Sequence, residues 1–241
     1  MNKYLLIFLV FSGLAIGKAQ ELTGPQLLQK TIAYHDPNGL WEVFQGKLFI
    51  TMSIPDGKER LSEVEINLPG EYFKLTSTKD DVIIEQVLNK EECILKLNGS
   101  TTISEEDKKS HKLTCERANL MKNYYTYLYG LPMKLKDQGT LIDPKVYQKT
   151  FKGKMYKVLK VTYKESVGND TWYFYFDPET YAMEVYQFYH DEEKNDGEYI
   201  ILNGLQEING IKMPKIRAWY YNKDDSYLGT DTLTPITAFK D

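Results

Sequence analysis

The chain is poor in the residues that most often mark a catalytic or metal site. Its 241 residues include three histidines and two cysteines, and these are too scattered to give the ligand spacing of a zinc site. Its glycines stand singly rather than in a phosphate-binding loop, and the motifs G-x-S-x-G, C-x-x-C and H-E-x-x-H do not occur. We therefore expect no metal and no cofactor, and we assign no catalytic residue.

The chain also lacks an excess of positive charge. It carries 30 Lys and Arg side chains against 34 Asp and Glu, a formal net charge of −4 at pH 7. Proteins that bind nucleic acid or anionic membrane surfaces use clustered basic residues to neutralise phosphates, and the sequence has no such cluster. It therefore predicts no nucleic-acid partner.

Long apolar runs are absent except near the start of the chain. Residues 4–16 (YLLIFLVFSGLAI) follow Lys3, and Gly17 and Ala19 supply the small residues of a cleavage site. A helix of this length is too short to cross a bilayer of about 30 Å, and the pattern is typical of a signal peptide. We predict a leader at residues 1–19 that is cut after Ala19, a periplasmic or secreted product, and no transmembrane segment after cleavage. The alternative is a retained N-terminal anchor.

The two cysteines, Cys93 and Cys115, can form one disulfide. Export to an oxidising compartment favours the bond. It would close a loop of about 20 residues, which is worth roughly 3 kcal/mol in the loop-entropy treatment. The alternative is a pair of buried thiols.

Aromatic residues are abundant and stand in short alternating runs. The chain has 19 Tyr, 10 Phe and 3 Trp, which favour strands. Strand patterns recur about every 8–15 residues and end at turn signals such as Asn98-Gly99. A short helix with a capping box at Thr23 and one long helix from Ser104 to Gly130 interrupt the series. The spacing predicts a meander of antiparallel hairpins in a single domain over residues 20–241.

This order of elements resembles the half-barrel of the periplasmic lipoprotein carriers LolA and LolB, in which a curved antiparallel sheet encloses an apolar cavity. Residues 170–180 (DTWYFYFDPET) resemble the strand-turn signature W-x-F-Y-x-D-P-x-T of that superfamily, and residues 198–214 resemble its Y-x…G-x-K-x-P hairpin. The resemblance implies a mainly β (α+β) fold, with a curved antiparallel sheet forming a half-barrel around one long helix.

At closer range the chain is similar to a family of uncharacterised secreted proteins of Gram-negative bacteria. Residues 33–38 (AYHDPN) and 123–137 (NYYTYLYGLPMKLKD) carry this similarity, which extends over nearly the whole chain after the leader. The family has no established activity to carry over. The likeness therefore implies a fold and a compartment, and it leaves the class of ligand open.

The long helix contains four tyrosines within six residues, more than one buried stripe needs. Tyrosine combines an apolar body with a polar tip, which suits a groove for an amphiphile. We expect a ligand site on this helix at Met121, Tyr124, Tyr125 and Leu128. The alternative is that the tyrosines pack against the inner side of the sheet.

Three further residues are candidates for the same site. Arg117 and Arg217 are potential contacts for a headgroup or carboxylate, although each could instead form a surface ion pair. His35 is the third candidate for this site. Together with Asp36 it could also act as an acid–base pair. The alternative for His35 is a histidine at a helix C-terminus, followed by a turn.

Two other histidines fit a solvated surface better than a site. His190 precedes three consecutive acids that could hold a cation by type, but alternate side chains of an extended segment point to opposite faces. The segment also runs into the turn at Asn195, and it lacks the spacing of a calcium loop. His111 stands among lysines and reads as a surface residue.

Three hypotheses of function remain. The leading one is a non-enzymatic periplasmic binding or carrier protein for an amphiphilic, lipid-like ligand. The second is a module that binds an envelope protein partner and has a fully packed interior. The third is a hydrolase or isomerase that uses His35 and Asp36, which requires His35 to lie in an open cleft. The volume and lining of the space between the long helix and the sheet distinguish these three hypotheses.

Overall fold

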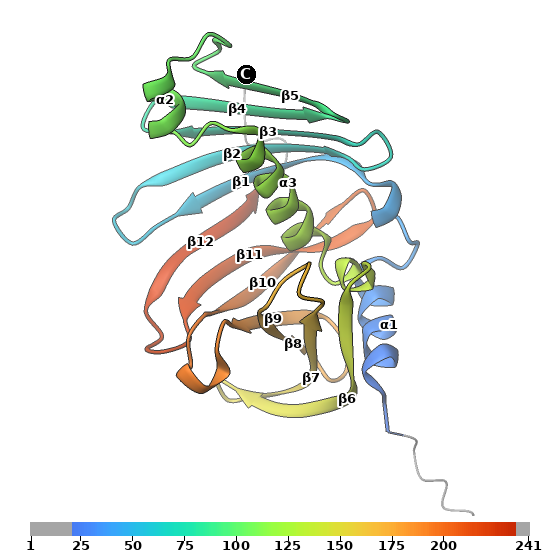
Figure 1. Ribbon diagram of the computed structural model, residues 1–241. Coiled ribbons are helices and arrows are strands. Elements are labelled where there is room, and N and C mark those ends of the chain that lie inside the picture. Colours follow the sequence, from blue (N-terminus) through green and yellow to red (C-terminus); the bar gives the residue numbers. More distant parts are fainter. Residues whose placement is uncertain (1–20, 235–241) are drawn as a thin grey trace, which may run out of the picture.

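The alternating runs of the sequence fold into twelve strands joined in one antiparallel sheet (Figure 1). The computed structural model describes residues 21–234, so the predicted leader at residues 1–19 and its cut after Ala19 lie outside the described residues. The strands are β1 (Gln45–Ser53), β2 (Glu59–Asn67), β3 (Tyr72–Lys79), β4 (Val82–Asn89), β5 (Glu92–Leu97), β6 (Thr140–Phe151), β7 (Lys154–Tyr163), β8 (Thr171–Phe176), β9 (Met183–Tyr189), β10 (Glu198–Ile208), β11 (Ile211–Tyr221) and β12 (Tyr227–Thr234).

Two meanders meet in the middle of this sheet. The strand order is β5-β4-β3-β2-β1-β12-β11-β10-β9-β8-β7-β6. Every pair of adjacent strands in the sheet is also consecutive along the chain, except β1 and β12, which meet at a seam. At the seam Ile50 lies opposite Leu233. The sheet is curved and does not close, with β5 and β6 as its two edges (Figure 1). The predicted fold class is confirmed.

The first helix, α1 (Gly24–His35), begins as the sequence predicts. The Thr23 side chain accepts a hydrogen bond from the Gln26 amide, and the Gln26 side chain accepts one from the Thr23 amide, which completes a capping box. Leu27 and Leu28 are buried. The helix contacts β6, β7 and β11.

The predicted long helix is bent into two pieces. Ser104 caps α2 (Glu105–Ser110), Lys112 then takes a left-handed conformation with φ of +52°, and Thr114 caps α3 (Cys115–Gly130). Leu120, although apolar and on α3, is 54% exposed. The buried face of α3 instead carries Ala118, Tyr125, Leu128, Tyr129 and Gly130.

One strand differs from the sequence prediction: β6 is a strand that the sequence analysis did not predict. A short 3-10 helix, η1 (Trp41–Val43), precedes β1. Pro144 interrupts the alternation of β6, and the pairing register with β7 shifts between Ile142 and Val146. Two further 3-10 helices are η2 (Met133–Lys136) and η3 (Glu192–Lys194).

The two faces of the sheet have different chemistry. The concave face packs against α1 and α3 in one apolar core that includes Leu27, Tyr125 and Phe174. The convex face of β1–β5 carries a lattice of ion pairs, in which Glu63, Glu65 and Glu85 neutralise three lysines, Lys47, Lys74 and Lys96. The convex face of β7–β9 holds a second, smaller cluster of Tyr156, Val158, Tyr173, Tyr175 and Val185.

The disulfide expected from the sequence is present. Cys93 on β5 is bonded to Cys115, the first residue of α3, across a sequence separation of 22. The bond fixes the N-terminal end of α3 to an edge strand of the sheet. Among the helices of residues 21–234, none is both long enough and apolar enough to cross a membrane.

Candidate functional site

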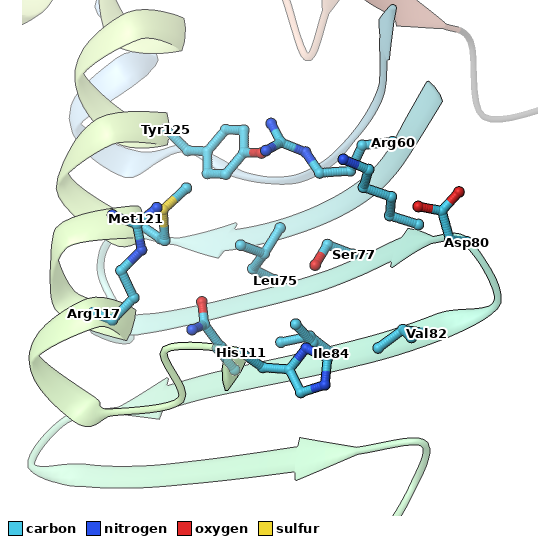
Figure 2. A pocket seen from close by; sticks show the side chains of 12 residues that line it. Arg60, Leu75, Ser77, Asp80, Val82, Ile84, His111, Arg117, Met121 and Tyr125 are labelled. Atoms are coloured by element: carbon cyan, nitrogen blue, oxygen red, sulfur yellow. The ribbon is translucent and has the colours of Figure 1, made fainter. Parts of the chain in front are cut away.

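An open cleft of about 370 Å³ lies between α3 and the concave side of β2, β3 and β4 (Figure 2). We call it the α3 cleft. Its apolar lining consists of Leu75, Val82, Ile84, Met121 and Tyr125. Its cationic lining consists of Arg60, Lys79 and Arg117, and the other lining residues are Ser77, Asp80, Gln86 and His111.

Strand alternation places these side chains in the cleft. On paired strands β3 and β4, Leu75 lies opposite Gln86 and Ser77 lies opposite Ile84, and residues two apart on a strand share a face. Figure 2 shows Leu75 and Ile84 on the floor, with Met121 above them on α3. The result is a floor on which Leu75 and Ile84 alternate with Ser77 and Gln86.

Tyr125 anchors the helix side of the cleft. Its hydroxyl donates a hydrogen bond to Ser62 Oγ over 3.2 Å, and the side chain is buried against β2 and β3. Burial raises the pKa of Tyr125 above its ordinary value of 10.0, so the phenol stays protonated at neutral pH. The guanidinium of Arg60 lies beside this hydroxyl (Figure 2).

The predicted ligand residues of the long helix divide among three environments. Arg117, Met121 and Tyr125 line the α3 cleft. Tyr124 lines a second cleft of about 490 Å³ on the other side of α3, where Tyr127 and Trp172 also lie. Leu128 is part of the packed core. The space between helix and sheet is therefore filled at Leu128 and open on both sides of it.

Arg217 is not at the surface, contrary to the ion-pair alternative. It is 0% exposed, and its guanidinium lies 3.9 Å from the centre of the Tyr129 ring. The two Nη atoms donate to the carbonyl oxygens of Pro214 (2.9 Å) and Leu128 (3.3 Å). Arg217 thus ties α3 to β11, and it lines neither cleft.

His35 is equally deep in the core. It is 0% exposed, its Nδ1 donates to the Lys212 carbonyl over 2.7 Å, and its Nε2 accepts from the Met183 amide over 2.9 Å. Burial lowers the pKa of His35 to about 4, so the ring is neutral near pH 7. Both nitrogens are bonded to backbone, which leaves neither for acid–base chemistry.

The acidic neighbours of the histidines also have structural partners. Asp36 accepts hydrogen bonds from the amides of Leu40 (2.7 Å) and Trp41 (2.9 Å) and so shapes the turn after α1. His190 pairs with Asp170 over 2.7 Å instead of with the acids that follow it. Within residues 21–234, no group of three His, Cys, Asp or Glu side chains gathers as a metal site would need.

Sequence reasoning missed most of the strand residues that complete the α3 cleft, and it assigned His111 to the surface. A signal did exist at Arg60, because it stands in phase with the buried residues Ser62, Val64 and Ile66. A charged residue in phase with a buried face marks a place where that face meets a cleft or a partner. The contribution of β3 and β4 required the pairing register.

The fold is similar to that of known half-barrels. A LolA superfamily protein from Nitrosomonas europaea superposes with a TM-score of 0.52 at 13% identity, covering 89% of this chain and 93% of that one. A putative outer membrane lipoprotein-sorting protein domain from Vibrio parahaemolyticus gives 0.49 at 12% identity, covering 90% and 94%. A DUF1329 family protein from Desulfovibrio piger gives 0.46 at 8% identity, covering 90% and 95%.

The first of these likenesses confirms the predicted resemblance to the LolA half-barrel, and it concerns the fold alone. A comparison with curated proteins gave no match. The profile of a family described as a family of unknown function (DUF6503) matches residues 3–235. The chain therefore belongs to the DUF6503 family.

Proposed function

We propose that this protein is an exported, non-enzymatic binder or carrier of an amphiphilic, lipid-like ligand, and that the ligand occupies the α3 cleft. The observation that carries the proposal is the open cleft itself, with an apolar floor at Leu75, Ile84 and Met121 and polar groups around it. Its volume of about 370 Å³ falls within the usual range for small-molecule sites. The LolA-like fold supports the same reading.

The packing around α3 sets where such a ligand would lie. Tyr125, Leu128 and Tyr129 are each at most 3% exposed, so a chain cannot pass between the centre of α3 and the sheet. It would lie along the edge of the helix, over β3 and β4. An interaction module with a fully packed interior fits less well, because the concave side keeps open space.

Uptake of a fluorescent fatty-acyl probe by the exported protein tests this proposal. Replacing Met121 with Trp fills the cleft and should lower the affinity for the probe at least about tenfold. Met155, which is 51% exposed, provides the control, because Met155→Trp adds the same bulk on β7, away from the cleft. Circular dichroism checks that both variants fold.

Two results would count against the proposal. One is a wild-type protein that takes up no acyl probe and carries no lipid in native mass spectrometry. The other is an M121W variant that binds the probe as tightly as M155W does, since the site would then lie elsewhere.

A further inference from the structure

Among the residues that the structure describes, basic side chains form ion pairs on the convex face of β1–β5 but not on the concave face. On the convex face Lys47 contacts Glu63 at 3.1 Å, and Lys74 and Lys96 contact Glu85 at 3.0 and 2.5 Å. On the concave face the cations of the α3 cleft form no ion pair with any residue of the described chain, although Asp80 lines the same cleft. In this part of the chain, Arg60, Lys79 and Arg117 therefore lack a close ion-pair partner, although Asp231 on β12 acts on Arg60 at longer range.

Arg60 differs from the other cations of the cleft because its side chain is partly buried. Lys79 and Arg117 are exposed, where an unpaired charge is ordinary. Arg60 is half-buried, and within residues 21–234 its Nε atom is buried without a hydrogen-bond partner. The Tyr125 hydroxyl, which donates to Ser62, can still accept from the guanidinium beside it, but within that range Nε remains without an acceptor. Arg217 Nε in the packed core lacks one as well, so what distinguishes Arg60 is its position in the cleft, where a ligand can reach its guanidinium.

Arg60 and Lys79 stand next to each other across two strands. Leu61 lies opposite Thr78 in the β2–β3 pairing, so Arg60, which precedes Leu61, and Lys79, which follows Thr78, come together at the same end of the cleft. Val82 lies opposite Lys79 on β4, and Ile84 and then Leu75 follow further along the floor of the cleft. The cleft thus offers two cations at one end and an apolar surface next to them.

We infer that the ligand of the α3 cleft is an anionic amphiphile, whose carboxylate or phosphate group accepts hydrogen bonds from Arg60 and Lys79 while its chain lies on Leu75 and Ile84. This inference rests on the proposed function, because it names the headgroup chemistry of the same site. A guanidinium and an ammonium side by side suit a group with several anionic oxygens. A neutral headgroup could accept a hydrogen bond but would leave both positive charges without a counter-ion.

Binding of matched ligands tests the inference. Oleate and oleamide share one acyl chain and differ in the charge of the head, and dodecyl phosphate supplies a phosphate head. We expect the wild-type protein to bind at least one of the two anions about tenfold or more tightly than oleamide. The tighter anion identifies the source of the headgroup. Inorganic phosphate alone should not displace it at equal concentration.

Two variants assign the preference to the named residues. Arg60→Gln should abolish most of the preference for the anion and leave the affinity for oleamide unchanged. Lys79→Gln, at an exposed position, keeps the test available if the Arg60 variant does not fold. Lys47→Gln on the convex face is the control and should retain the preference.

The outcomes separate the inference from the proposed function. Equal affinity for oleate, dodecyl phosphate and oleamide would overturn the headgroup assignment while amphiphile binding stands. Displacement of the bound anion by inorganic phosphate would overturn it as well, because the cations would then serve a free anion. Failure of every acyl ligand to bind would instead remove the proposed function.

Discussion

Several side chains that the sequence offers for chemistry act in this fold as internal braces. His35 connects the end of α1 to the backbone of two other segments, at Met183 and Lys212. Arg217 connects β11 to the carbonyl of Leu128 on α3. Polar groups inside a protein must be hydrogen-bonded to be tolerated there. These residues therefore hold helices on the concave face, and the ligand site that we propose lies at the edge of α3.

The buried neutral state of His35 predicts a pH dependence of stability. Its pKa falls from the ordinary 6.5 to about 4 on folding, so between these pH values the unfolded chain binds a proton that the folded chain does not. Protonation then favours unfolding, and stability should fall by about 2 kcal/mol between about pH 7 and about pH 5. Urea unfolding at the two pH values measures this change.

The His35→Gln variant is the control for that measurement. It should be less stable at neutral pH, because the backbone contacts of the ring are lost, and it should show a much smaller loss of stability on acidification. An equally large loss in the variant would show that other groups cause it.

Part of the candidate site could be predicted from single residues. The tyrosine run drew attention to α3, and Arg117, Met121 and Tyr125 do line its cleft. The depth of Arg217 could not be predicted, since arginine is almost never fully buried and its partners are carbonyl groups on distant segments. Arg60 needed its strand phase to be noticed.

At the level of elements, the end of α3 is fixed by close packing on η1. A Cβ atom added at Gly130 would lie 2.3 Å from Cζ2 of Trp41. Gly130→Ala should therefore destabilise the protein by about 1–3 kcal/mol through overpacking, despite the better helix propensity of alanine. Thermal unfolding measures the loss.

Gly168 provides a matched control for that substitution. A Cβ atom there meets nothing within 4 Å, so Gly168→Ala should change stability little. If Gly130→Ala proved as harmless as Gly168→Ala, the tight contact with Trp41 would not exist in solution.

The disulfide positions the other end of α3. Replacing both Cys93 and Cys115 with Ala should cost about 3 kcal/mol, because the bond closes a loop of 22 residues. Arg117 and Met121 follow directly on α3 and line the cleft, so binding of the acyl probe should weaken as well. Urea unfolding and probe titration check the two effects separately. A loss of stability with unchanged binding would show that the bond does not shape the cleft.

Element boundaries were predictable where local signals are strong. The capping box at Thr23 and the turn at Asn98-Gly99 are present, and both turn residues have positive φ. The break at Lys112 was not predictable, because a non-glycine residue in the left-handed region leaves no pattern in the sequence. The strand β6 was missed because Pro144 reads as a turn.

At the scale of the whole molecule, the antiparallel sheet follows from local hairpins, but the seam between β1 and β12 does not. Each meander pairs strands that are neighbours along the chain, which a series of short turns predicts. The pairing of Ile50 with Leu233 joins segments from opposite ends of the described chain. No local pattern specifies such a contact, so the strand order needed the structure.

The contrast between local hairpins and the long-range seam predicts the order in which the sheet forms. Contacts between distant segments require a large loop to close before they stabilise the fold. Leu233 is 0% exposed at the seam, so Leu233→Ala should cost about 2–5 kcal/mol, and we expect most of that cost as faster unfolding rather than slower folding. Stopped-flow kinetics in urea measure both rates. A folding rate that carries most of the loss would show that the seam forms early.

The position of β12 has a consequence for how the protein tolerates damage. The last strand of the described chain occupies the middle of the sheet, between β1 and β11. A protease that removed it would leave two partial sheets, each with a newly bared row of backbone amide and carbonyl groups. Such rows readily pair with other chains. Loss of β12 alone would thus convert the folded protein into a source of aggregates, whereas trimming β5 at the edge would bare one strand.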